Sequence, residues 1–448
     1  MITSLASAVF VVGAWIARVR TGTWLNPFTP PLFVFALEAA LAGGVGVVQP
    51  SENYAALSLR TQLIVLVVSL SSLALVGFLG ESRLAGPVQI RPRMPLRLLI
   101  LFAGVLIVGA TVYLIGRNEG VPFLTIARKF AMGWGTHYSE YDIPFLTPAA
   151  LGLNRFIFLV LAVDLMAMGV PLREHLRRRS VEYTVALVTL ICVFASGRRN
   201  VFLWPVLFLS IANVMRGWRP RSLFRPKTIA AMAIILLAFT WAGNVRLGGS
   251  GVSASPLSHL VAEELGESWL SGVLTGAVLY LAPNLSNLDV MVENGPRPAG
   301  GLIIVSQMLP RGVVELFGEE PASAITYLRE RELLPFRGMT FRTIFADLAA
   351  DFGPYGAVLA GMLLFGLSVV AHNRARRSGH WLKLYLAFIP GLIMFPLLNQ
   401  YTGLPTLLPV LLLGTLVRVR ADVPGGGAVR GVRGRTAGYQ STKSSIPA

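Results

Sequence analysis

The chain has 448 residues, of which 54% are hydrophobic and only 14% are charged, and its mean hydropathy is +0.64. A soluble domain carries about 25% charged residues, so this composition excludes a water-covered surface and indicates one covered by lipid. The net charge of +17 would suit a nucleic-acid partner. The basic residues, however, form short clusters between apolar runs, so we expect no nucleic acid.

Motifs for metals and nucleotides are missing from the sequence. Cys192 is the one cysteine, which excludes an internal disulfide, and the five histidines do not show zinc-binding spacing. No Walker A sequence, Rossmann fingerprint or G-x-S-x-G elbow is present. We expect no metal and no cofactor, with energy coming from a preactivated substrate or from a gradient.

Eleven apolar runs approach the roughly 20 residues that a helix needs to cross the bilayer core. Because they show no alternation, they predict helices and not a barrel. We expect an all-α fold, a polytopic membrane helix bundle with about 11 transmembrane helices and a large outward loop containing short interfacial helices. The runs cover residues 2–17, 31–49, 61–80, 98–116, 151–171, 181–196, 200–215, 228–243, 354–371, 384–399 and 403–417.

The basic clusters predict the orientation, since cytoplasmic connections carry an excess of Lys and Arg. Most of these residues fall in alternate connections and in the tail, which predicts an N-terminus outside and a C-terminus in the cytoplasm. The first 15 residues carry no basic side chain, unlike a cleaved signal peptide. The clusters are Arg18/Arg20, Arg83–Arg97, Arg173–Arg179, Arg216–Lys227, Arg374–Lys383 and Arg418–Lys443.

This pattern divides the chain into four parts. Residues 1–243 form an N-terminal bundle of about eight spans, and 244–353 form a large extracytoplasmic loop with amphipathic helices at the membrane interface. Residues 354–417 supply about three further spans. The basic, Gly/Ser-rich tail, 418–448, is expected to be disordered in the cytoplasm.

Two adjacent arginines, Arg198 and Arg199, lie in a tight turn between two spans, on the side that the rule predicts to be poor in cations. Snorkelling and helix capping are one explanation, and an anionic ligand at the outer surface is the other. Guanidinium groups bind phosphate oxygens bidentately, so several together would suit a diphosphate. Further outward arginines near span ends are Arg246, Arg337 and Arg342, whereas Arg329 and Arg331 are left out because ordinary loop ion pairs explain them equally well.

Three groups are candidates for a general base. Asp347 and Asp351 are four residues apart on a predicted helix, 340–352, and so share a face. A carboxylate there could accept a proton from a sugar hydroxyl, or the pair could order arginines or cap a helix. His137 is an alternative base or a surface histidine.

Glu38 and Asp164 lie within apolar spans, where an ionisable group is costly and usually functional. Such residues could couple a transporter to protons, whereas Glu38 could equally pair with an arginine near a helix end or be protonated. Two isolated acids are a weak transporter signal.

With these features the chain resembles the Wzy-type O-antigen polymerases, also called oligosaccharide repeat-unit polymerases, which are related to O-antigen ligases. The resemblance rests on the Ser196-Gly197-Arg198-Arg199 turn between paired spans and on the late outer loop. It also rests on the stretch from Thr340-Phe341-Arg342 to Asp351-Phe352-Gly353-Pro354-Tyr355-Gly356, which enters a glycine-rich span. The first 30 residues, the loop 117–148 and the tail lie outside it.

The resemblance implies a metal-independent glycosyltransferase at the outer face of the bacterial cytoplasmic membrane, which polymerises sugar repeat units carried on undecaprenyl diphosphate. Its partners would be this lipid-linked oligosaccharide, membrane lipid, a chain-length regulator and a flippase. A ligase that transfers the glycan to another acceptor is not separated from it. A transporter or flippase for a lipid-linked sugar is the alternative from another class, with a non-enzymatic scaffold third.

On this reading the predicted site residues have three roles. Arginines stabilise the charge that grows on the leaving diphosphate, one acidic or imidazole group takes the hydroxyl proton, and further side chains bind the sugar. The first role falls to Arg198, Arg199, Arg246 and Arg342, the second to Asp351, Asp347 or His137, and the third to Arg337, Trp134, Tyr138 and Tyr141.

Overall fold

The computed structural model describes residues 2–48, 57–86, 88–117, 146–194, 199–217, 281, 284–295, 298, 344–393 and 404–421. Five helices of this part are long and apolar enough to cross a membrane, namely α1, α3, α4, α7 and α18. The chain is therefore a helical membrane protein, as its composition predicts. The total of about 11 spans stays a prediction, since the expected span 228–243 lies outside the described residues.

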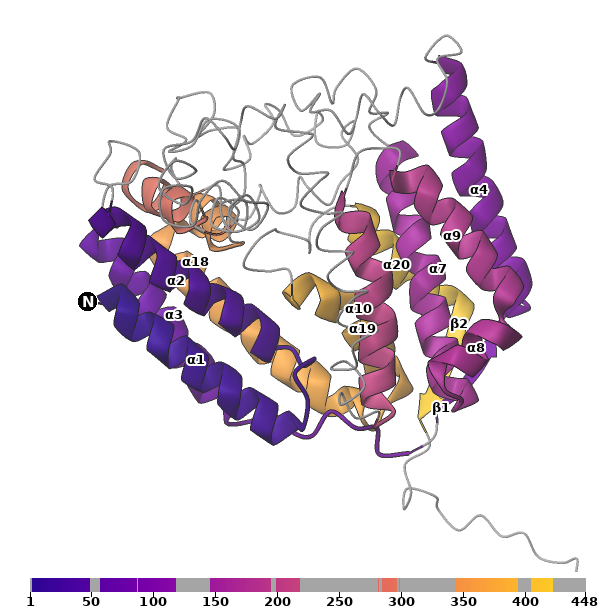
Figure 1. Cartoon of the computed structure of the whole chain (residues 1–448), viewed down its shortest axis with the longest axis horizontal. Coiled ribbons are helices and arrows are strands. Elements are labelled where there is room, and N and C mark those ends of the chain that lie inside the picture. The colour runs from indigo at the N-terminus through magenta and orange to yellow at the C-terminus, as the bar shows by residue number, and fades with distance from the viewer. Residues whose placement is uncertain are drawn as a thin grey trace, which may run out of the picture.

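The described helices form two groups (Figure 1). In one group α1 (Ile2–Thr21) packs on α2 (Thr29–Val48) and α3 (Leu59–Val76), and α3 packs on α18 (Ile344–Ala375). In the other, α7 is central. Around α7 (Leu146–Met168) lie α4 (Leu96–Arg117), α9 (Ser180–Phe194), α10 (Leu203–Met215) and α20 (Leu404–Leu416). Helix α19 (Gly379–Ile393) contacts both α18 and α20 and so joins the groups.

One end of the bundle is tied together by backbone hydrogen bonds to the segment that follows α3. The bonds run from Ser82 N to Thr21 O (3.1 Å), from Leu84 N to Met215 O (2.8 Å) and from Ala85 N to Arg376 O (3.1 Å). The ends of α1, α10 and α18 therefore meet at this segment. We call this end of the molecule the basic end and the opposite one the far end.

A two-stranded antiparallel ribbon adds to the basic end. Strand β1 (Val88–Pro92) precedes α4 and pairs with β2 (Val417–Ala421), which follows α20. The sequence prediction missed it, because the two strands are short and far apart in the chain. Nearby, Lys383 Nζ donates to Val417 O (2.9 Å), which satisfies a carbonyl just past α20.

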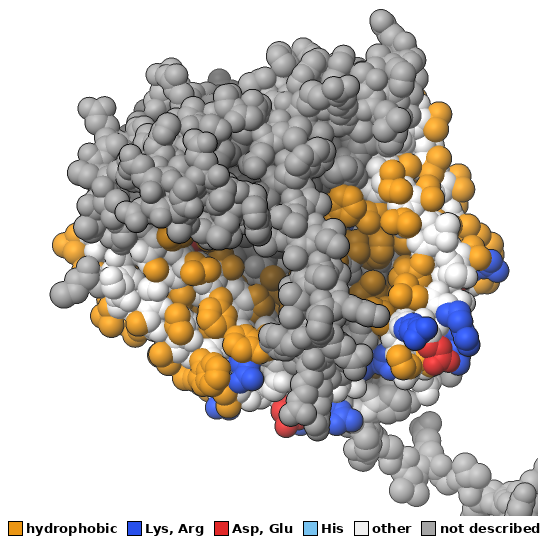
Figure 2. All heavy atoms as spheres, viewed as in Figure 1, with side chains coloured by type: hydrophobic (Ala, Val, Ile, Leu, Met, Phe, Trp, Pro, Cys, Tyr) orange, Lys and Arg blue, Asp and Glu red, His pale blue; other side chains and the backbone are white. Residues whose placement is uncertain are grey.

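These connections determine the direction of each helix. The helices α1, α3, α7, α10, α18 and α20 run toward the basic end, and α2, α4, α9 and α19 run away from it. Figure 2 shows Lys and Arg side chains gathered at the lower edge of the molecule, with hydrophobic side chains over the flanks. The alternation agrees with that expected from the basic clusters. Which side of a membrane the basic end faces is still a prediction.

Helix α18 consists of two arms, 344–352 and 354–375, separated by a kink at Gly353 (φ 73°, ψ 174°). A Cβ atom added to Gly361 would lie 2.3 Å from Phe345 Cε1. In a straight helix these two residues would be about 24 Å apart. The first arm therefore folds back on the second, and the glycine at 361 leaves room for the Phe345 ring. The kink lies directly after residue 352, where the predicted helix 340–352 ends.

We expect Gly353→Ala to destabilise the protein by about 1–3 kcal/mol, because this backbone conformation is open almost only to glycine. Gly366→Ala is the matched control, since no atom lies within 4 Å of a Cβ there and its φ is not positive. The measurement is the temperature at which half of the purified protein is lost from its monodisperse peak in size-exclusion chromatography. If both variants were lost at the same temperature, the kink would not require a glycine at position 353.

Candidate functional site

Three predicted site residues lie within the described part of the chain: Arg199, for its backbone, and Asp347 and Asp351. The others lie outside it, namely Trp134, His137, Tyr138, Tyr141, Arg198, Arg246, Arg337 and Arg342. Their predicted roles stay predictions.

Arg199 opens a short 3-10 helix, η1 (Arg199–Phe202), between α9 and α10. Helix α9 leaves the basic end and α10 returns to it, so Arg199 lies at the far end of the bundle. This position agrees with the predicted placement of the arginine turn on the side opposite the basic clusters.

A buried arginine that the sequence analysis missed lies close to this turn. Arg155 on α7 is 7% exposed, and its guanidinium carbon lies 3.7 Å from the centre of the Trp204 ring. Its Nη1 donates to Thr406 Oγ1 at 3.1 Å. An arginine stacked on an indole and bonded to a hydroxyl is held in a fixed orientation. A single cation within the apolar run 151–171 was the sequence signal that could have revealed it.

Positive electrostatic contributions converge on Arg155. Trp204 is in the first turn of α10 and Thr406 is in the first turn of α20. The N-terminal end of a helix carries a partial positive charge, and a full charge within a bilayer is costly. Arg199 lies five residues before Trp204, within about 10 Å along a 3-10 helix. These four residues, which we call the arginine site, are suited to an anion.

The two candidate carboxylates lie on the first arm of α18. Every residue from Phe345 to Asp351 is buried, and Asp347 and Asp351 are both 0% exposed. The four-residue spacing places them on one face of this arm, as predicted. The Phe345 ring packs on Phe35 of α2, with the ring centres 5.8 Å apart. An enclosed carboxylate can accept a proton or balance a cation, so both predicted roles remain open.

Part of the large loop docks onto the first group of helices. In the helical segment 284–294, Asn284 Nδ2 donates to Glu38 Oε1 at 2.6 Å, and both residues are 0% exposed. Asp289 accepts hydrogen bonds from Ser58 N (3.0 Å) and Ser58 Oγ (2.7 Å) just before α3. The segment therefore lies beside the middle of α2 and the far end of α3.

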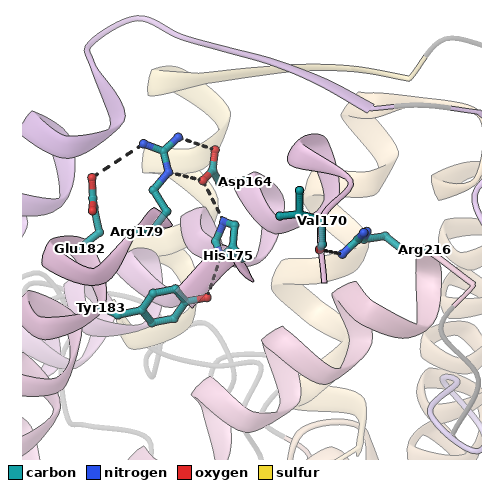
Figure 3. A network of polar contacts seen from close by, with 7 residues as sticks. All are labelled: Asp164, Val170, His175, Arg179, Glu182, Tyr183 and Arg216. Atoms are coloured by element: carbon teal, nitrogen blue, oxygen red, sulfur yellow. Dashed lines mark hydrogen bonds and ion pairs between the residues drawn. The ribbon is translucent and has the colours of Figure 1, made fainter. Parts of the chain in front are cut away.

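Asp164 takes part in a polar network where α7, α8 (Leu172–Arg178) and α9 meet (Figure 3). Its Oδ2 lies 3.0 Å from His175 Nε2 and accepts a 2.8 Å bond from Arg179 Nε, while His175 Nδ1 lies 3.0 Å from Tyr183 Oη. A carboxylate held by two partners at the basic end joins three helices. Asp164 is therefore paired with a cation near the end of α7, and its part in a transport path loses support.

Among the described residues there is no group of three or more His, Cys, Asp or Glu side chains arranged to hold a metal ion. Comparisons with protein-family models, with curated proteins and with solved structures find no match. The likeness to the repeat-unit polymerases therefore rests on the sequence features alone.

We expect Asp164→Leu to destabilise the protein by about 3 kcal/mol, because the partly buried Arg179 loses its 2.8 Å partner and keeps only the 3.8 Å contact to Glu182. Glu174→Ala is the control, since the Glu174–Arg178 pair is exposed and such pairs contribute about 0.5 kcal/mol or less. The measurement is unfolding of the purified protein in mild detergent with increasing denaturant. A similar loss in both variants would show that the network is not a structural clamp.

Proposed function

We propose that the protein is a metal-independent glycosyltransferase of the bacterial cytoplasmic membrane, which polymerises oligosaccharide repeat units carried on undecaprenyl diphosphate at the outer face. The observation that supports this proposal is the buried guanidinium of Arg155, at the N-terminal ends of two helices and beside the turn of Arg199. A diphosphate is the kind of anion that this charge would attract in an apolar setting.

In the proposed reaction, the bond between the anomeric carbon of the donor and the diphosphate oxygen breaks, and the acceptor hydroxyl oxygen forms the new glycosidic bond. Arg155 and Arg199 stabilise the charge on the leaving diphosphate in a site of low dielectric constant. Asp351 or Asp347, with His137 as the alternative, accepts the hydroxyl proton. The other predicted contributors are Arg198, Arg246 and Arg342 at the diphosphate and Arg337, Trp134, Tyr138 and Tyr141 at the sugars.

Arg155→Gln and Arg199→Gln should each lower the rate of polymerisation by about 100-fold or more, the effect of removing one preorganised charge-stabilising group. The assay incubates the purified protein in vesicles with lipid-linked repeat units and separates the glycans by length. Arg177→Gln, an exposed arginine at the basic end, should be as active as the parent protein. Full activity in both site variants would refute the proposal.

The proposal also requires the far end to face outward. In a Cys192→Ser background, Arg199→Cys should react with a membrane-impermeant maleimide in intact cells, whereas Arg177→Cys should react only after permeabilisation. This follows from the positive-inside rule, because the basic clusters lie at the end that holds Arg177. The reverse labelling pattern would place the arginine site in the cytoplasm and contradict the proposal.

A transporter for a lipid-linked sugar is a second candidate, favoured by Glu38. This carboxyl is fully buried in α2, its Oε1 bonds to the Asn284 amide, and its Oε2 has no hydrogen-bond partner among the described residues. Such a group can carry a proton through a conformational cycle. If the lipid-linked sugar crossed the vesicle membrane unchanged and no lengthened glycan formed, the protein would be a transporter. Transfer to a different lipid acceptor would identify a ligase.

A further inference from the structure

Helix α3 packs against α18, and specific contacts join the second arm of α18 to α3 and to the residues that follow α3. At the far end, the guanidinium carbon of Arg60 lies 5.2 Å from the centre of the Tyr355 ring. Toward the basic end, Asn373 donates to Phe78 O and accepts from Gly80 N, both at 2.8 Å. Both helices run toward the basic end, so they share a parallel seam with matched ends.

Each helix carries a stripe of exposed apolar side chains that starts at the Arg60–Tyr355 contact. On α18 the stripe repeats every four residues, and its members are 61–71% exposed: Tyr355, Leu359, Leu363 and Leu367. The stripe on α3 is 45–63% exposed: Leu59, Leu63, Val67 and Leu70. Twelve residues of helix measure about 18 Å, roughly the thickness of one leaflet of a 30 Å bilayer core.

A cationic side chain, Arg60, lies at the far end of this apolar seam. Arg60 is exposed and lies in the first turn of α3, whose N-cap residue Ser58 donates hydrogen bonds to the Asp289 carboxylate. In the described part of the chain it forms no ion pair with a carboxylate. The exposed guanidinium would therefore stabilise an anionic group there. An apolar track of one leaflet's length under a cation matches a lipid with an anionic headgroup.

We infer that the seam between α3 and α18 docks the isoprenoid chain of the lipid-linked acceptor, with its diphosphate at Arg60. This rests on the proposed function, since a polymerase brings two lipid-linked units together. Tyr355 follows Asp351 by four residues, and the kink at Gly353 lies between them. A unit held at this seam has its sugar next to the carboxylates that accept the hydroxyl proton. The donor diphosphate occupies the arginine site in the other group of helices.

The test uses full-length protein in nanodiscs of zwitterionic phosphatidylcholine and, as probe, undecaprenyl diphosphate with a photoreactive diazirine in its isoprenoid chain. After irradiation, labelled residues are identified by mass spectrometry. We expect label on Leu63, Val67, Leu359 and Leu363, and about tenfold less in Arg60→Gln, because one charge-assisted contact is lost. Arg60→Lys should retain most of the label.

A second variant fills the seam without touching the charge. Leu363→Trp should lower the labelling of α3 several-fold, whereas Leu187→Trp on α9, which alters a residue 55% exposed on the other group, should have no effect. Folding of each variant is checked by its monodisperse peak in size-exclusion chromatography.

Three results would overturn the inference. Label spread equally over the flanks of α4 and α9 would show no docking surface. Displacement of the probe by phosphatidylglycerol as readily as by undecaprenyl diphosphate would mark an ordinary phospholipid contact. Cross-links through the seam between two copies of the chain would mark an interface between subunits. Specific label on the seam without glycan synthesis would refute the proposed polymerase but support the lipid site. Glycan synthesis with dispersed label would support the polymerase but refute the lipid site.

Discussion

The free-energy cost of placing a charged side chain in lipid is the main constraint on this structure. A charged side chain within a bilayer must reach an end of its helix or find a polar partner. Asp164 pairs with His175 and Arg179, and Glu38 bonds to an amide from the large loop. Arg155 is held against an indole and a hydroxyl. Each of these contacts joins separate helices, so the same cost that restricts the charges also determines which helices pack together.

The two ends of the bundle differ in construction for this reason. Backbone hydrogen bonds and the β1–β2 ribbon close the basic end, and Lys and Arg side chains lie on the surface there. Toward the far end, in contrast, three charged groups of the described residues are enclosed: Asp347 and Asp351 of α18 are fully buried, and Arg155 is nearly so. Burial strengthens electrostatic interactions because little water screens them. A reaction that develops charge on a diphosphate gains most at such an end.

Residues of the candidate site differed in how far the sequence revealed them. The shared face of Asp347 and Asp351 follows from helical spacing alone, which is a local property. The far-end position of Arg199 follows from counting spans and basic clusters. Arg155 is marked in the sequence only as one cation in an apolar run, and its significance comes from Trp204 and Thr406 on other helices. Pairing of β1 with β2 was missed for the same reason, since the partners are distant in the chain.

By itself, the sequence determined that the protein is built of lipid-facing helices, that they alternate in direction, and where its charges interrupt them. Hydrophobicity, helical spacing and charge are properties of residues close together in the chain, so they can be evaluated from the sequence without knowing the tertiary structure. Only the tertiary structure decided that the first arm of α18 folds back at Gly353, that α3 lies against the second arm, and that Arg155 meets Trp204. Apolar helices can pack on one another in many ways with similar energy, so these partners follow from the shapes and few polar contacts of the assembled bundle.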